Sequence, residues 1–190
     1  MGLIKKASRR TLRRRYEAAA EAGDADAMLF LGTVTANDDA AVSREWFRRA
    51  AEGGNPHAMY IVGLYLEPHD RVASRSWLER AADRQHVDAM IKLGVLDQAT
   101  DPAAARRRYE QAAARRSAIA MFNLGLMHEP TDRATAIDWY EQAVEAGDAD
   151  AMFNLAKLVE ATEPARARAL LEQAAAGGQS EARERLASAQ

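Results

Sequence analysis

The sequence repeats itself every 31 residues, and this period constrains the fold more than any other feature of the chain. The dipeptide Ala-Met recurs at that interval in five copies, and a sixth copy decays to Ala182-Arg183. Leu or Val follows four residues after each of these alanines, and Gly or Ala comes next. The five intact copies begin at Ala27, Ala58, Ala89, Ala120 and Ala151. Because no insertion breaks the register, the chain consists of one structural unit repeated in series.

Each period contains two helical patterns. In the second copy the apolar residues from Ala58 to Leu66 fall at i, i+1, i+4, i+5 and i+8, which is one face of an α-helix. A second pattern, seen from Ala105 to Ala113, has the spacing i, i+4, i+7, i+8. Asp, Asn or Ser precedes most of these patterns, as expected of residues that cap a helix N-terminus, and Gly often follows the second pattern. The period therefore predicts a helix-turn-helix repeat.

These patterns predict an all-α fold with a leading helix near 9–22 and a closing helix near 180–188. The expected helix pairs lie at about 25–53, 56–84, 87–115, 118–146 and 149–177. Helices of this length are marginal when isolated, so each pair must pack against its neighbours. We expect a single repeat domain over residues 9–190, preceded by a basic segment at residues 1–8.

Composition narrows the function classes. The chain has no Cys, which excludes disulfides, thiolate metal sites and cysteine nucleophiles. The net charge of −2 argues against nucleic-acid binding by the whole molecule. No stretch approaches the roughly 20 apolar residues of a membrane span, so we expect a cytoplasmic protein.

Residues that could carry chemistry do not form a catalytic motif. His57, His69, His86 and His128 are never at the i, i+4 spacing of a helical metal pair, and are interpreted as surface or capping residues. The sequence contains neither a phosphate-binding glycine loop nor a nucleophile elbow. The methionines of the repeat lie on the apolar face and are expected in the core, and the tryptophans are expected to be half-buried. We expect no enzyme activity, cofactor, metal or small-molecule substrate.

The fourth repeat resembles the tetratricopeptide superfamily, and in particular its Sel-one-like repeat branch. The resemblance rests on Trp139-Tyr140, Ala143, Gly147, Ala151 and Leu155, and it extends over residues 9–188. It implies a right-handed α/α superhelical solenoid that acts as an adaptor. The connection inside each repeat is shorter than is usual in that branch. Its length is closer to that of an ordinary tetratricopeptide repeat.

In this superfamily the first helix of each repeat lines a concave groove that holds a peptide or a partner domain. By position, the resemblance implies a groove lined by Tyr60, Leu64, Ile91, Lys92, Phe122, Asn123, Phe153, Asn154 and Lys157. Neighbouring Asn and Lys side chains resemble the set with which some members grip a carboxylate. Alternatively, each Asn satisfies a backbone group in the next repeat.

Basic residues form two further candidate contacts. Residues 1–15 contain Lys and Arg but no acidic residue, and Arg9, Arg10, Arg13 and Arg14 recur at helical spacing. This segment is either a polar cap on the first repeat or a contact with acidic lipid or nucleic acid. In the third repeat Arg108 and Arg116 replace Trp and Gly within an arginine-rich stretch, which is either a solvated face or a partner contact.

The sequence therefore predicts a non-enzymatic scaffold or adaptor in a bacterial cytoplasm, with a peptide or protein partner in the groove. The alternative is a peripheral membrane or nucleic-acid adaptor that acts through its basic N-terminal helix. A third hypothesis is a regulatory module of a larger protein.

The glycine that follows each Leu or Val of the first pattern is predicted to allow close approach of a neighbouring helix. We therefore expect Gly94→Leu to destabilise the fold by overpacking, by about 1–3 kcal/mol. Thermal unfolding of the variant measures this, and an unchanged midpoint would contradict the packing role.

Overall fold

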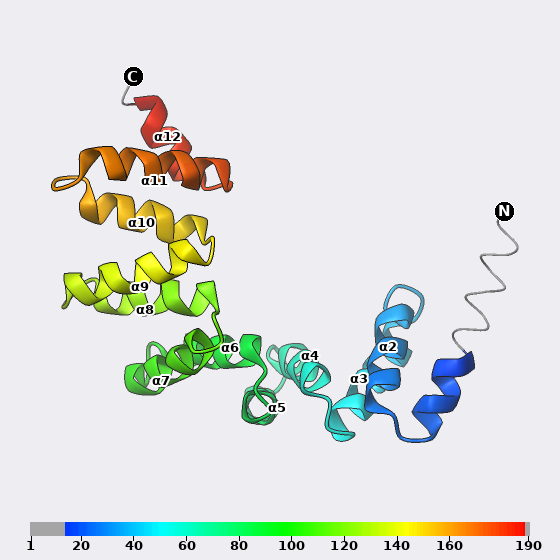
Figure 1. Ribbon diagram of the computed structural model, residues 1–190. Helices are drawn as coiled ribbons and strands as arrows, with labels where there is room; N and C mark the ends of the chain where they lie inside the picture. Colours follow the sequence, from blue (N-terminus) through cyan, green and yellow to red (C-terminus); the bar gives the residue numbers. More distant parts are fainter. Residues whose placement is uncertain (1–13, 189–190) are drawn as a thin grey trace, which may run out of the picture. The chain divides into compact units, whose positions relative to one another are not determined.

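The computed structural model describes residues 14–188, which form helices joined by short turns and contain no strand (Figure 1). Residues 14–21 are helical. The first helices of the five repeats are α2 (Ala25–Thr35), α4 (Pro56–Leu66), α6 (Val87–Asp97), α8 (Ala118–His128) and α10 (Ala149–Val159). The second helices are α3 (Ala40–Glu52), α5 (Arg71–Asp83), α7 (Pro102–Ala113), α9 (Arg133–Glu145) and α11 (Pro164–Ala176), and α12 (Ser180–Ser188) closes the chain. The prediction of an all-α helix-turn-helix repeat is confirmed.

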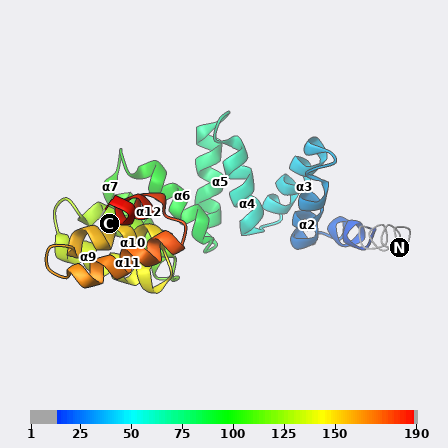
Figure 2. The ribbon, with the colours of Figure 1, turned by 90° about the horizontal axis from the view of Figure 1, so that it is seen from above.

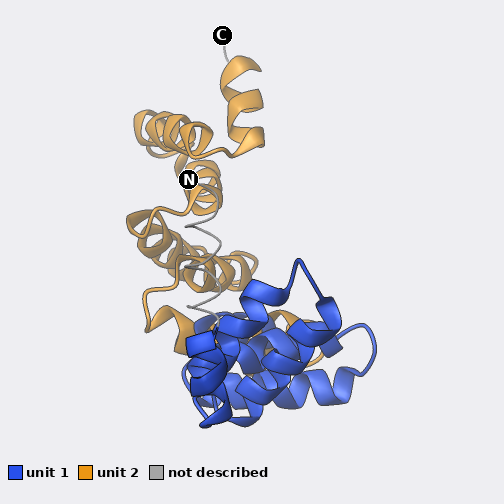
Figure 3. Ribbon diagram, turned by 90° about the vertical axis from the view of Figure 1, so that its right-hand side faces the viewer, with its two compact units in different colours: residues 1–93 blue, residues 94–190 orange. Residues whose placement is uncertain are grey.

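The chain divides into two compact units, residues 1–93 and 94–190, with the division inside α6 (Figure 3). In unit 1, α2 packs on α3, α3 on α4, and α4 on α5, and the last pair lies side by side in Figure 2. In unit 2, each helix from α7 to α12 packs on the next. A continuous domain over residues 9–190 stays a prediction.

Side-chain caps begin most of the helices, as the sequence predicts. Asp24 and Asp148 accept backbone N–H groups at the start of α2 and α10. Asn55 and Ser117 do the same for α4 and α8. An aspartate likewise caps each second helix from α3 to α9, whereas Glu163 before α11 makes no such bond. These caps satisfy N–H groups that would otherwise lack a partner, and so fix where each helix begins.

The two helices of a repeat meet at a glycine. The large side chain of the second helix lies against this glycine, and a Cβ built on Gly94 would be 2.5 Å from Cε1 of Tyr109. The corresponding pairs are Gly32 with Phe47, Gly63 with Leu78, and Gly125 with Tyr140. We call this contact the glycine socket. The close approach predicted from the sequence therefore occurs inside each of these repeats.

Two kinds of hydrogen bond accompany the glycine socket. In the first two repeats, Ser43 and Ser74 each donate a 2.7 Å hydrogen bond to the carbonyl oxygen of the socket glycine. In the fourth repeat the hydroxyl of Tyr140 donates instead to Oε2 of Glu129 at 2.7 Å. Burial raises the pKa of Tyr140, and its bond to Glu129 adds to the effect, so the hydroxyl remains a donor.

The repeat methionines Met28, Met59, Met90 and Met121 are buried, as predicted, while Met152 is partly exposed. The three tryptophans are half-buried, also as predicted. Alanines fill most of the remaining core, so the helices can pack closely with few large side chains.

In the turn that follows each second helix, one residue has a positive φ, again with a period of 31 residues. Glycine occupies this position at Gly23, Gly54, Gly147 and Gly178. Gln85 and Arg116, which flank the third repeat, adopt the same conformation with φ values of 71° and 62°. A side chain makes this conformation unfavourable, so these two turns are held in place by the helices they join.

We expect Arg116→Gly to raise the free energy of unfolding by about 0.5–1 kcal/mol, because it relieves the left-handed strain. This increase in the free energy of unfolding is smaller than the strain energy that is relieved, since glycine also raises the conformational entropy of the unfolded chain. Urea unfolding measures the change, with Arg107→Gly inside α7 as a control that should lose about 1 kcal/mol. Equal losses in both variants would contradict the assignment.

Candidate functional site

In unit 1 the predicted groove residues lie on α4 and α6 in a partly polar setting. Tyr60 is half-buried, and its ring stacks on His86 with a centroid distance of 4.8 Å. Leu64 is exposed, and Ile91 is partly exposed. Nζ of Lys92 lies 2.9 Å from Oε1 of Glu67, so this cation already has a carboxylate partner.

The structure brings together two histidines that the sequence analysis treated as scattered. Nδ1 of His57 lies 3.1 Å from Nε2 of His86, although the residues are 29 positions apart. His86 occupies the capping position of α6, as expected of a capping residue, and its Nδ1 accepts the N–H of Ala89 at 3.3 Å. An accepting Nδ1 places the proton of a neutral ring on Nε2, so His86 donates to His57. The contact follows from the repeat, because adjacent repeats place the starts of their first helices together.

This arrangement keeps His86 neutral. Burial lowers the pKa of His86, the neighbouring charge of His57 lowers it further, and Asp88 opposes both. A metal ion on Nε2 would require the proton to move to Nδ1, where it would displace the helix cap. In residues 14–188, no three His, Asp or Glu side chains lie close enough together to hold a metal ion.

In unit 2 the predicted groove residues differ in how accessible they are. Phe122 is partly exposed, with its ring centroid 6.0 Å from that of Tyr140. Phe153 is only 8% exposed and belongs to the packed interior. Lys157 is exposed, and its Nζ lies 5.5 Å from the centroid of the Phe153 ring. The groove as a whole stays a prediction, since its residues are divided between the two units.

The two asparagines are engaged within the protein. Nδ2 of Asn123 donates to the carbonyl oxygen of Ile119 at 2.8 Å, which is one turn earlier in the same helix. Nδ2 of Asn154 lies 3.5 Å from the hydroxyl of Tyr140. Asn123 therefore bonds within its own helix, whereas the alternative interpretation placed its partner in the next repeat.

The structure also exposes apolar side chains that the sequence analysis did not single out. Val95 is 51% exposed, Leu126 is 37% exposed, and Ile119 is 53% exposed. Val95 and Leu126 occupy the same repeat position as Leu64. The period alone could have identified these residues, because this repeat position was already assigned to the groove.

Of the predicted basic contact, Arg9, Arg10 and Arg13 lie outside the described residues. Arg14 is exposed on the helical segment at 14–21. No helix within residues 14–188 is long and apolar enough to cross a membrane.

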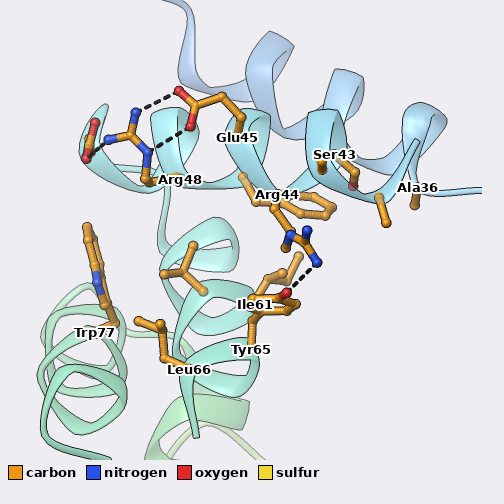
Figure 4. Close-up of a pocket in the computed structure, with 14 residues that line it drawn as sticks. Ala36, Ser43, Arg44, Glu45, Arg48, Ile61, Tyr65, Leu66 and Trp77 are labelled. Atoms are coloured by element: carbon orange, nitrogen blue, oxygen red, sulfur yellow. Dashed lines mark hydrogen bonds and ion pairs between the residues drawn. The ribbon is translucent and has the colours of Figure 1, made fainter. Parts of the chain in front are cut away.

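Unit 1 contains an open cleft of about 760 Å³ that the sequence analysis missed (Figure 4). Its walls come from α3, α4 and Trp77 of α5, and are mostly apolar, with Ile61 and Leu66 among them. Two arginines lie at this cleft. The guanidinium of Arg48 contacts both Glu45 and Glu52, whereas Arg44 donates to the hydroxyl of Tyr65 and lies 5.0 Å from the centroid of its ring.

A chain of helix pairs with exposed apolar positions on successive first helices defines the class of α-helical repeat scaffolds. A family model described as Sel1 repeat matches residues 17–55, 56–86, 118–148 and 149–179. The chain therefore belongs to the Sel1 repeat family, and the predicted resemblance is confirmed. This repeat is typically a non-catalytic scaffold, and its members generally mediate protein–protein interactions.

The matched segments leave out residues 87–117, the third repeat. This is the repeat in which Arg108 stands at the tryptophan position and Arg116 at the glycine position.

Solved structures share the fold. A Sel1 repeat protein from Oxalobacter formigenes is 23% identical with a TM-score of 0.81, and the match covers 88% of this chain and 78% of that one. A protective antigen of uropathogenic Escherichia coli strains, which displays an SLR fold, is 22% identical with a TM-score of 0.74. That match covers 85% of this chain but only 40% of the antigen.

An immunity protein from Pseudomonas aeruginosa is 19% identical with a TM-score of 0.56, over 84% of this chain and 66% of that one. At these identities the three structures show the fold alone. The comparison with curated proteins gave no match.

The neutral histidine cap predicts a pH dependence of stability. The pKa of His86 is lower in the folded state than in the unfolded state. The neutral ring therefore contributes to the free energy of unfolding above the unfolded pKa, and this contribution is lost as the pH falls through the folded pKa. We expect the free energy of unfolding to decrease between about pH 7 and pH 5. His86→Asn should remove this component, because an Asn cap does not titrate.

Urea unfolding at a series of pH values measures the effect. His69→Asn is the matched control, since His69 lies in the turn between α4 and α5, away from the cap. If His69→Asn flattened the pH profile and His86→Asn did not, the capping interpretation would be wrong.

Proposed function

We propose that this chain is a non-enzymatic scaffold that binds a peptide or protein partner through the exposed faces of its first helices. One observation carries the proposal: the same repeat position presents an exposed aliphatic side chain in three successive repeats, at Leu64, Val95 and Leu126. Single exposed apolar residues are normal on a protein surface, but their recurrence at one repeat position gives each of these three first helices the same apolar contact point for a partner.

The polar residues around this face in unit 2 suit an acidic ligand group. Lys157 has no carboxylate partner within residues 14–188, and it lies against Phe153 near the surface. Phe122 and Ile119 supply apolar area on α8, one helix earlier among the first helices. An apolar centre with a polar, solvent-accessible rim is the usual arrangement of a protein interface, and Lys157 would lie in that rim.

The family supports the absence of catalysis, since its repeat is typically a non-catalytic scaffold. The bacterial and cytoplasmic setting expected from the sequence stays a prediction.

A photocrosslinking amino acid at residue 126 tests the proposal in the native cell. We expect a discrete covalent adduct from position 126 and none from position 103, because Ala103 is exposed on the second helix α7. Phe122→Ala should reduce the yield from position 126 at least about fivefold, since we expect Phe122 to be one of the few interface residues whose truncation costs more than about 1 kcal/mol of binding energy.

Mass spectrometry of the adduct identifies the partner. Identical adducts from positions 126 and 103, or no adduct from either, would contradict binding through the first helices.

A further inference from the structure

Each unit contains a cleft, and residues at equivalent positions of the repeat line both clefts. The unit 1 cleft is lined by Ala36, Ala40, Arg44 and Ile61, among others. Four periods of 31 residues later, the corresponding residues Glu160, Pro164, Arg168 and Arg185 line a cleft of about 530 Å³ in unit 2. Each cleft is therefore a feature of the junction between one repeat and the next.

In unit 2, polar contacts cross these junctions. Arg185 on α12 pairs with Glu160 at the end of α10, and Arg166 on α11 pairs with Glu141 on α9 at 2.6 Å. A guanidinium N–H of Arg133 on α9 also donates to the carbonyl oxygen of Leu158 on α10. These three contacts tie consecutive repeats together across the surface of unit 2.

The equivalent positions at the unit 1 cleft cannot form such contacts, although the next junction of unit 1 has one, the ion pair between Lys92 and Glu67. Glu160 and Arg185 correspond to Ala36 and Ile61, and Arg133 corresponds to Ala40. Glu141 and Arg166 correspond to Arg48 and Ala73. At Ala36, Ala40 and Ile61 the small or apolar side chains leave the larger cleft of unit 1 open, and its walls are partly exposed.

The two arginines at this cleft differ in whether a carboxylate neutralises them. Arg48 is neutralised by Glu45 and Glu52, but Arg44 has no carboxylate partner within residues 14–188. Its guanidinium instead lies over the ring of Tyr65, which leaves N–H donors for a ligand (Figure 4). Trp, Tyr and Arg are the residues that contribute most to binding energy at protein interfaces, and all three line this cleft.

We infer that the unit 1 cleft is a second partner-binding site, which takes a peptide segment with apolar side chains and a nearby carboxylate. The apolar side chains lie between α3, α4 and Trp77, and the carboxylate receives N–H donors from Arg44. The inference rests on the proposed scaffold function but concerns a different surface, since none of the lining residues belongs to the predicted groove. The volume lies within the range of ligand pockets in proteins and exceeds the size of a single side chain.

A phage library of random dodecapeptides, panned on the full chain, tests the inference. Counter-selection uses the closing variant Ala36→Glu/Ile61→Arg, which copies the Glu160–Arg185 pair and should narrow the cleft toward the smaller volume of its unit 2 counterpart. Ala40→Arg, which copies Arg133, is a second closing variant in case the first does not fold. We expect enriched peptides with two or more apolar residues and at least one Asp or Glu.

Fluorescence anisotropy of the most enriched synthetic peptide then provides the decisive measurement. We expect at least about tenfold weaker binding to a folded closing variant, and about tenfold weaker binding to Arg44→Ala. Replacing the acidic residue of the peptide by its amide should make Arg44→Ala and the wild type bind equally. Ala103→Glu/Gln111→Arg, which adds the same charges to exposed positions of α7, should bind like the wild type.

Three outcomes would overturn the inference: no enrichment, unchanged binding to a folded closing variant, or binding of dodecanoate in place of any peptide. The last result would make the cleft a lipid site. A persistent adduct from position 126 alongside any of these outcomes would refute this site alone and leave the proposed function intact.

Discussion

The pairing of helices within a repeat depends on the glycine socket, in which a large side chain of the second helix lies against a glycine of the first. At Gly125 a Cβ would lie 2.4 Å from Cε1 of Tyr140, a distance that no side chain tolerates. Glycine is unfavourable in a helix interior by about 1 kcal/mol relative to alanine. Each socket therefore lowers the stability of the first helix locally but allows the two helices to pack closely. The net effect is favourable because the helices are short and gain most of their stability from contact with one another.

In the fifth repeat a different pair of residues occupies the two socket positions. Ala156 stands at the glycine position there, and Leu171 stands where Tyr140 lies in the repeat before; both are buried. A larger residue on the first helix is thus accompanied by a narrower one on the second. The second repeat, with Gly63 and Leu78, shows that glycine does not require an aromatic partner.

Departures from the common pattern give individual repeats side-chain interactions that the others lack. The repeat fixes where each helix and turn occurs, so a residue that differs between equivalent positions acts on a nearly constant backbone. Ala36 and Glu160 illustrate this: one leaves an open apolar cleft, while the other pairs with an arginine across the next junction. His86 is another example, because a titratable ring takes the capping place that Asn55 and Ser117 hold elsewhere.

The sequence alone determined the period, the helices and their caps, because these depend on local spacing and on hydrogen bonds within a few residues. It also placed four of the five repeat methionines in the core, since these residues lie on the apolar face of each first helix, whereas Met152 is partly exposed. The cleft beside Trp77 and the hydrogen-bonding distance between His57 and His86 were decided only by the tertiary structure. Both join side chains from different repeats, and their distances depend on how closely neighbouring helices pack, which the period does not specify.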